Sequence, residues 1–413
     1  MSALGGWQQG SVDGESPAAG AVVICLPVGS SLSRWASTGE LERECGLHAR
    51  LASVYPLVVL VSDGDASDEA AMASALGAGV RVVAGGGDVA HAGACRRNWI
   101  AERVAGLVRG AGARSVIVQT EQMSGCGFSV PIVGALAGEG FAVRLVARAG
   151  YRWSRFVARE AGANSAEALA AGEEERALCA AADLVVANTR DTLEDLAWRY
   201  GLDAGRTVVV PDFVPGDERV NPATNRLATS VVSAGELIER KGFDLLVRAV
   251  SMMSESRRSG VRLVLLGEGP DGARLRALAA ELGVALELRP PTTYGAMLEA
   301  LSTCGVYAQA SEHEGDPRAV LEAMATGSAC VVADSPGLGE VVEHAVTGLR
   351  SPREPEAFAR MIEGLLEDRE WAEAMGQAAA RTVRSRFGIE CVLERELMAH
   401  RLAFKQAARS EAA

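Results

Sequence analysis

The sequence lacks any run of 18 consecutive apolar residues, so we expect no transmembrane helix. Basic residues are in the minority, because 41 Lys and Arg stand against 53 Asp and Glu, for a formal net charge of −12. Nucleic-acid binding needs a net basic surface, so nucleic acid is not expected as a partner. The same charge disfavours general adhesion to an anionic membrane, although a local basic patch leaves a peripheral membrane contact open.

Patterns for metal binding, disulfides and nucleophilic hydrolysis are missing as well. The eight Cys show no Cys-x-x-Cys spacing, several lie in apolar runs, and the five His are dispersed. We therefore expect buried free thiols in a reducing, cytoplasmic compartment, rather than disulfides or a zinc site. Ser, Cys and His do not line up as a nucleophile with its base, so no hydrolase triad is expected. Residues 1–20 contain no Lys or Arg, which predicts a disordered tail rather than a signal peptide.

The sequence does contain short apolar runs that alternate with longer segments rich in Ala, Leu and Arg. This alternation predicts parallel strands covered by helices on both faces. The first series of expected strands is Ala21–Leu26, Leu57–Ser62, Val80–Ala84, Ser115–Gln119, Ala142–Ala147, Leu184–Ala187 and Thr207–Val210. Helices expected between them include Gly39–Ala52, Cys95–Val108 and Ala166–Ala181.

The alternation stops at Pro211–Pro222, whose Pro, Asp and Gly content predicts a domain linker. A second series of strands follows at Ser230–Ala234, Arg262–Leu266, Ala285–Leu288, Gly305–Ala308 and Ala329–Ala333, and the chain ends in helices at Glu354–Leu366, Glu370–Arg386 and Ile389–Lys405. We expect an α/β protein with two doubly wound, Rossmann-like domains that face a central cleft. The predicted boundaries are 21–213 for the first domain, 214–388 for the second, and 389–413 for a closing helix.

Two carboxylates eight positions apart, Glu314 and Glu322, mark the most informative stretch of the chain. The first follows a strand-like run, and the second lies in an Ala-, Leu- and Met-rich segment that reads as a helix. A loop carboxylate and a helix carboxylate about two turns further on can contact two hydroxyl-bearing parts of one ligand. Gly315 between them lets backbone amides approach a ligand at the helix N-terminus.

A second candidate segment opens the second domain. Lys241-Gly242 precedes an apolar helix, so a cation and free backbone amides would meet a phosphate there. The plain alternative is a solvated surface lysine.

Together these segments resemble the large family of retaining GT-B glycosyltransferases called family 4, or glycosyl transferases group 1. The resemblance covers roughly residues 21–405 and is most specific over 230–350. It implies transfer of a sugar from a nucleotide-diphosphate sugar, most often a UDP-sugar, to a small-molecule, polysaccharide or lipid-linked acceptor. It implies retention of configuration, no metal or other cofactor, and a last helix that crosses back onto the first domain.

The resemblance also assigns roles to residues. Glu314 would contact the transferred sugar, Glu322 would hold the ribose hydroxyls, and Lys241 would neutralise the diphosphate leaving group. Arg148, in an R-x-G-Y segment, takes the place of a histidine that contacts the sugar in many members. Further donor-binding residues are Gly315, Asp316, Pro317, Arg240, Gly235 and Ser31.

The sequence departs from the family pattern at Glu236, which stands where an arginine of the diphosphate clamp is usual. We expect Glu236 to point away from the diphosphate and Arg240 to supply the missing cation. The departure also keeps open the alternative of a non-catalytic nucleotide-sugar-binding subunit.

Two loops of the first domain are further candidates. The segment Gly29–Glu44 reads either as a loop that closes on the donor phosphates or as a helix capped by Ser37 or Thr38. The cluster Arg152–Phe156 would hold an acceptor, touch a membrane surface or form a plain solvated loop, and the loop Gln119–Pro131 would face the acceptor.

Two rival motifs remain. Gly267-x-Gly-x-x-Gly272 follows an expected strand, as a dinucleotide fingerprint of an oxidoreductase would, but it does not open its domain. Asp63-Gly-Asp65 matches the Asp-x-Asp that holds a divalent metal in other glycosyltransferases, yet such clusters are also common turns.

Overall fold

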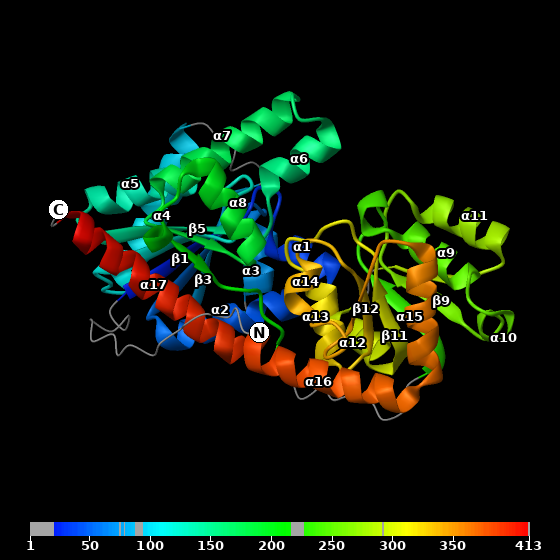
Figure 1. The fold of residues 1–413 in the computed structure, drawn as a ribbon. Coiled ribbons are helices and arrows are strands. Elements are labelled where there is room, and N and C mark those ends of the chain that lie inside the picture. Colours follow the sequence, from blue (N-terminus) through cyan, green and yellow to red (C-terminus); the bar gives the residue numbers. More distant parts are fainter. Residues whose placement is uncertain are drawn as a thin grey trace.

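The computed structural model describes residues 20–73, 76–77, 79–86, 94–215, 227–290 and 293–411. It contains two parallel sheets, each flanked by helices, and the two α/β domains lie side by side (Figure 1). The expected tail over residues 1–20 falls outside the described residues, apart from Gly20, which begins the first strand. Among the described residues, no helix is both long enough and apolar enough to span a membrane.

The first domain is built on a sheet with the strand order β3-β2-β1-β4-β5-β6-β7, seven parallel strands among the described residues. The order reverses between β1 and β4, and such switch points are where open parallel sheets bind ligands. The strands are β1 (Gly20–Cys25), β2 (Leu57–Ser62), β3 (Val80–Ala84), β4 (Ser115–Thr120), β5 (Ala142–Ala149), β6 (Leu184–Ala187) and β7 (Thr207–Val209). The helices are α1 (Leu32–Thr38), α2 (Leu41–Val54), α3 (Ala66–Ala73), α4 (Ala94–Gly110), α5 (Ser129–Gly138), α6 (Trp153–Ala161), α7 (Ala166–Ala181) and α8 (Arg190–Tyr200).

The second domain has the order β10-β9-β8-β11-β12-β13, with six parallel strands in the described part of the chain. Its strands are β8 (Leu227–Ala234), β9 (Arg262–Leu266), β10 (Ala285–Arg289), β11 (Cys304–Gln309), β12 (Cys330–Ala333) and β13 (Leu349–Ser351). Its helices are α9 (Phe243–Ser251), α10 (Glu255–Arg258), α11 (Gly272–Leu282), α12 (Tyr294–Thr303), α13 (Arg318–Ala325), α14 (Leu338–Val341), α15 (Pro355–Glu367) and α16 (Arg369–Phe387), and the short 3-10 helix η4 spans Glu239–Lys241.

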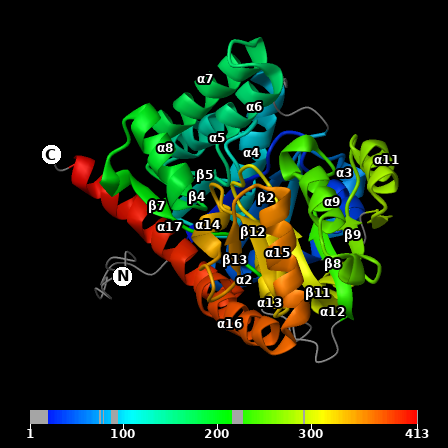
Figure 2. The same cartoon turned by 45° about the vertical axis from the view of Figure 1, so that its right-hand side comes forward.

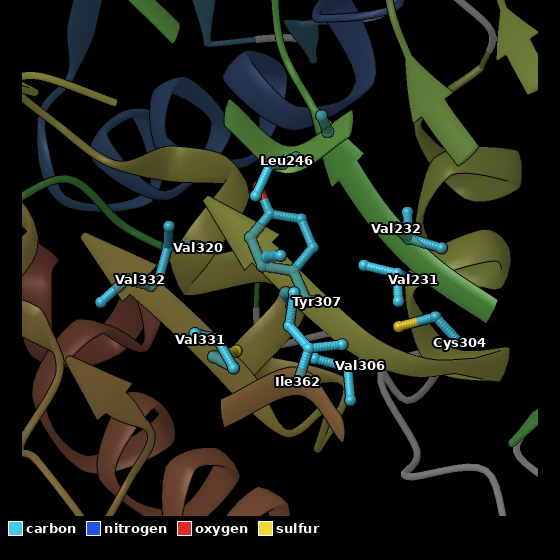
Figure 3. Close-up of a cluster of buried hydrophobic side chains, with 14 of the residues drawn as sticks. Val231, Val232, Leu246, Cys304, Val306, Tyr307, Val320, Val331, Val332 and Ile362 are labelled. Carbon is cyan, nitrogen blue, oxygen red and sulfur yellow. The ribbon is translucent and has the colours of Figure 1, made fainter. Parts of the chain in front are cut away.

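The sheets owe their stability to central strands that are buried on both faces. In Figure 3, Val306 of β11 lies beside Ile362 of α15, whereas Tyr307, the next residue of the same strand, points to the other face of the sheet toward Leu246 of α9. Tyr307 is fully buried, so its hydroxyl needs a partner, and it donates to Oε1 of Gln309 at 2.6 Å. Burial of such aliphatic side chains contributes roughly 1.5–3 kcal/mol each. This rigid sheet fixes the loops that begin where β8 and β11 end.

The last helix, α17 (Ile389–Glu411), belongs to the first domain in its packing. Figures 1 and 2 show α16 and α17 as one path that runs from the second domain along the first. Ile389, Val392 and Leu393 are buried in a core cluster formed with strands of the first sheet. The crossing point is held by a parallel bridge between Val214 and Gly388.

One local expectation was wrong. Ser37 and Thr38 do not cap a helix start, because they form the last turn of α1, and both hydroxyls donate to the carbonyl of Arg34. Gly39 ends that helix with φ 79°, a left-handed conformation that glycine adopts without strain. The hydroxyl that caps α1 is that of Ser31, which accepts from the amide of Arg34.

The cysteines agree with the expectation of free thiols. Six of the described cysteines are buried and Cys391 is half-buried, and none of these seven forms a disulfide. Burial raises the pKa of the Cys179 thiol to about 12, so this thiol is unreactive at neutral pH.

Candidate active site

A cleft of about 1000 Å³ lies between the two domains at the ends of their strands, next to the predicted motifs. The second domain contributes loops after β8 and β9 and the start of α13, including Gly235, Lys241 and Glu322. The first domain contributes Arg34 and Thr38 of α1 and Arg43 of α2. The carboxyl ends of parallel strands meet at one edge of a sheet, which explains why segments far apart in sequence line one cleft.

Glu314 and Lys241 meet at the centre of this arrangement. Lys241 Nζ lies 2.7 Å from Glu314 Oε1, and Gln309 Nε2 donates to the same oxygen at 3.2 Å. Arg240 reaches the other oxygen of Glu314 at 3.4 Å. Burial opposes ionisation of Glu314, but the charge and hydrogen bond of Lys241, the hydrogen bond of Ser311 and the charge of Arg240 together hold the pKa of this carboxyl below its ordinary value. Both cations that the sequence proposed for a phosphate therefore lie beside the carboxylate proposed for a sugar.

Lys241 owes its position to the glycine that follows it. Gly242 has φ 66°, and a Cβ built there would lie 2.4 Å from the carbonyl oxygen of Ala310. Only glycine fits this turn, which joins η4 to α9 and aims the lysine at the strand end of β11.

Glu322 faces the cleft from α13 and meets a cation of the first domain. Arg43 Nε lies 3.9 Å from Glu322 Oε1, and both side chains are buried. Burial is the main cause that raises the pKa of Glu322 to about 7, against the opposing charges of Arg43 and Arg318. The carboxyl is thus divided between its neutral and ionised forms near neutral pH.

A buried charge network links the domains next to Glu322. Asp212 accepts from Arg43 at 2.5 Å and also pairs with Arg318. Burial opposes ionisation of Asp212, yet Arg318 and Arg43 hold its pKa well below the ordinary range. Asp316 shows the opposite behaviour, because burial and the neighbouring Asp212 raise its pKa. The two carboxyls share a hydrogen bond, which favours the ionised form of Asp212 and the protonated form of Asp316.

The Gly267–Gly272 turn has a packing explanation. A Cβ on Gly267 would lie 2.0 Å from the carbonyl oxygen of Gly235, and one on Gly269 would lie 2.6 Å from that of Leu237. The glycines therefore let the loop after β9 pack on the loop after β8. The turn lines the same cleft but follows the second strand of its domain in the chain, so it is not the dinucleotide fingerprint of a first βα unit.

A second, smaller cavity of about 380 Å³ adjoins the cleft and shares Glu314, Asp316 and Arg318 with it. Its other walls come mainly from the loops after β4 and β5 and from α6 of the first domain. Gly315 lines this cavity because it touches the other domain: a Cβ there would lie 2.2 Å from Tyr151 Cβ and 2.6 Å from the carbonyl oxygen of Gly150.

Two predicted site residues are not brought to the site. Arg148 is buried under α17, where NH1 donates to Glu396 at 2.5 Å and NH2 donates to the carbonyl of Val210. It lines neither cavity, because its side chain faces the α17 side of the sheet. Ser31 uses its hydroxyl to cap α1, and it too is absent from both linings.

The other predicted site residues differ in which cavity they line. Pro317, Gly235 and Asp316 line the larger cleft, whereas Arg240 lines the smaller cavity. Glu236 is exposed in the wall of the larger cleft, so its orientation toward a bound diphosphate stays a prediction. Asp63 is buried and accepts from the amide of Gly29 at 2.9 Å, which anchors the loop before α1. Among the described residues, no cluster of His, Cys, Asp and Glu fits a metal ion.

Several site residues had no sequence signal of their own. Arg43 and Asp212 come from an ordinary helix and from the linker, and Glu121 follows β4 inside a loop that was only broadly assigned. Burial, followed by the charge of Glu44, raises the pKa of Glu121 to about 8. The available signal was their place at strand ends, which is shared by many residues without a function.

Residues 218–382 match the sequence model of the family described as Glycosyl transferases group 1. A D-inositol 3-phosphate glycosyltransferase of Xylanimonas cellulosilytica is 34% identical over 239 residues, which cover 52% of this chain and 56% of that protein. The lipopolysaccharide core biosynthesis glycosyltransferase LpsE of Rhizobium meliloti is 28% identical over 216 residues, covering 51% and 62%. The chain thus spans about half the length of the curated relatives it matches.

Solved structures match over nearly the whole chain. HepE of Anabaena, solved with UDP and glucose, has a TM-score of 0.66 at 18% identity and covers 92% of this chain and 99% of its own. Sucrose-phosphate synthase of Thermosynechococcus elongatus has a TM-score of 0.68 at 18% identity and covers 93% and 99%. At this identity the likeness shows the fold, which is the two-domain GT-B architecture.

Proposed function

Because residues 218–382 make this chain a member of the glycosyl transferases group 1 family, we propose that it transfers a sugar from a nucleotide-diphosphate sugar to an acceptor. The donor is a UDP-sugar, a choice supported by the structure of HepE in complex with UDP and glucose. The acceptor is a small molecule, a polysaccharide or a lipid-linked saccharide. The transfer retains the anomeric configuration and needs no metal.

The observation that carries this proposal is the pairing of Lys241 with Glu314 in a cleft between the two domains. Lys241 Nζ lies 2.7 Å from Glu314 Oε1, and Gly235 lies beside the lysine side chain. A donor that enters the cleft would exchange part of this ion pair for contacts of its own. The lysine then neutralises the leaving diphosphate while the carboxylate contacts sugar hydroxyls.

In this mechanism the protein acts mainly through electrostatics. Lys241 stabilises the charge that develops on the departing diphosphate, and such preorganised stabilisation is usually the largest catalytic contribution. Glu322 accepts hydrogen bonds from the ribose hydroxyls and so fixes the nucleotide. Contacts between the domains, such as that of Gly315 with Tyr151, exclude water that would hydrolyse the donor.

A panel of nucleotides and nucleotide sugars, tested by thermal shift and then by turnover, examines the proposal. A ligand that binds the native state alone raises the apparent stability, so UDP and one UDP-sugar should raise Tm selectively. Slow hydrolysis of that donor should persist with a chelator present. Loss of turnover with EDTA and rescue by Mn²⁺ would instead point to the Asp63–Asp65 pair.

Glu236 favours one alternative, a nucleotide-sugar-binding subunit without catalysis. Its carboxylate is exposed in the cleft wall next to Gly235, where it would repel a diphosphate. Nucleotide binding without turnover of any donor, across a broad acceptor panel, would favour this alternative.

A further inference from the structure

The smaller cavity is lined by three arginines at α6: Arg152, which stands at its N-cap position, and Arg155 and Arg159 within the helix. Arg152, Arg155 and Arg159 are three and four residues apart, a spacing that places side chains on the same side of a helix. None of the three belongs to the lining of the larger cleft. The three arginines therefore contact whatever occupies the smaller cavity, not a ligand in the larger cleft.

The three arginines differ in how their charge is balanced. Arg152 pairs with Asp191 at 2.9 Å, and Arg155 pairs with Asp195. Arg159 forms no ion pair with any described carboxylate, and its NH1 donates to Nδ1 of His313 at 2.6 Å. An arginine can only donate, so this nitrogen of the imidazole carries no proton.

His313 does not balance that charge either. Burial, followed by the charges of Arg159 and Arg240, lowers the pKa of His313 to about 4, so the ring is neutral at pH 7. The carboxyls in the cavity wall add little negative charge. Burial raises the pKa of Glu121 to about 8, Asp316 lies 3.6 Å from Arg318, and Glu314 is already paired with Lys241 and Arg240. The cavity is left with a net positive charge centred on Arg159.

Aromatic rings complete the cavity. Tyr151 and Phe156 lie edge to face with centroids 5.8 Å apart, and the Arg240 guanidinium lies 5.5 Å from the Phe156 ring centroid. A volume of about 380 Å³ falls within the usual range for small-molecule sites. Rings beside cations suit a compact ligand that has an apolar face and a negative group.

We propose that the acceptor carries an anionic group, a phosphate monoester, and that Arg159 together with Arg155 binds it in the smaller cavity. The inference rests on the proposed function, because it takes the larger cleft as the donor site. It narrows the acceptor from any hydroxyl-bearing saccharide to one with a phosphate a short distance from the reacting hydroxyl. The shared Glu314 marks where the two ligands meet.

The test uses the full chain saturated with UDP, so that the diphosphate site is filled. Inorganic phosphate is titrated at constant ionic strength, and binding is followed by calorimetry for the parent protein, Arg159→Gln and Arg109→Gln. Arg109 is a matched control, since it is an exposed arginine on α4 that lines neither cavity. We expect Arg159→Gln to weaken phosphate binding at least tenfold and Arg109→Gln to leave it unchanged.

Two ligand arms then identify the source of the phosphate. A soluble hexose 6-phosphate is compared with the free hexose. Vesicles that contain phosphatidylinositol 4-phosphate, whose headgroup carries a phosphate monoester, are compared with phosphatidylinositol vesicles. Preference for either phosphorylated form that is lost in Arg159→Gln supports the inference. Phosphate binding that is absent, or equal in both variants, overturns it even where UDP binds normally. Failure of every nucleotide to bind overturns the proposed function instead, so the two failures are distinguishable.

Discussion

The wall of the cleft from the second domain and the wall from the first domain differ in how many segments of the chain form them. In the second domain, the donor side comes from two compact segments, and Glu314, Glu322 and Lys241 all line the larger cleft. In the first domain, the smaller cavity collects residues from the loops after β1, β4 and β5 and from α6. Compact motifs form where one turn and one helix hold a ligand. A cavity assembled from several strand ends leaves no such signature.

Among the variants of the two walls, Lys241→Ala should cause the largest loss of donor turnover. Lys241→Ala removes the cation at the leaving group, and loss of one preorganised charge or donor costs about 10²–10³ in kcat. Lys405→Ala is the matched control, because Lys405 is the only other lysine and is exposed on α17. Steady-state turnover of the donor measures both. Normal turnover in Lys241→Ala would mean that this segment is not the phosphate clamp.

Gly315→Ala tests whether the two sides must touch. The new Cβ would lie 2.2 Å from Tyr151 Cβ, so the domains would have to part. A displacement of about 1 Å at a reacting centre can cost about 10²-fold in rate, and we expect a loss of that order in turnover. Gly295→Ala is the control, since a Cβ there meets nothing within 4 Å. Small-angle scattering should show a more open particle for Gly315→Ala alone, and an unchanged rate would contradict the close contact.

Glu322→Ala tests the donor side by affinity. A hydrogen bond to a charged group contributes about 1.5–3 kcal/mol, so UDP affinity should weaken at least tenfold in the folded variant. Glu299→Ala serves as control, because Glu299 is exposed on the neighbouring α12 and lies outside the cleft lining. Calorimetric titration with UDP decides the matter. Equal affinities for the parent and Glu322→Ala would show that the ribose site lies elsewhere.

The raised pKa of Glu322 predicts a pH dependence of donor binding. Its carboxyl titrates near pH 7 in the free protein, and only the ionised form accepts from both ribose hydroxyls. UDP affinity should therefore fall by up to about tenfold from pH 8 to pH 6, following the fraction ionised. Glu322→Gln should flatten the profile in this window. A profile that stays the same in Glu322→Gln would assign the titration to another group.

The raised pKa of Glu322 affects the stability of the fold in the opposite direction: donor affinity rises with pH, whereas the stability contribution of this group falls. The native state holds a proton on Glu322 between its unfolded pKa of 4.5 and about 7, where the unfolded state has lost it. This group therefore stabilises the fold at the acidic end of that window, and the contribution is lost as the pH rises through it.

Glu236→Arg should have the smallest effect. An exposed charge contributes about 0.2–1 kcal/mol, so UDP affinity should rise by no more than about fivefold, with normal turnover. Glu239→Arg is the control, since Glu239 is also exposed but does not line the cleft. Abolished turnover in a folded Glu236→Arg protein would show that the acid has a role of its own in the site.

The sequence determined much of the fold and the donor side. Strands β2, β3, β6 and β9 occupy the residues expected from their apolar runs. The run is clearest in β2 and β6, where every residue is buried, because strands buried on both faces must be continuously apolar. Strand β13, only three residues long, was missed because so short a run has no readable period. Lys241 and Glu314 lie together because each follows a strand of one sheet and neighbouring parallel strands end at the same edge.

Tertiary structure decided the rest, because distance along the chain does not tell which face of a strand turns toward which helix. Arg148 was expected at the site, but its side chain lies on the face covered by α17, where Glu396 binds it. Burial would raise the pKa of Glu396, yet Arg148 and His400 hold it below the ordinary value, so the pair stays ionised. The pairings of Arg43 with Glu322 and of Arg159 with His313 join separate domains, and only the packing of those domains creates them.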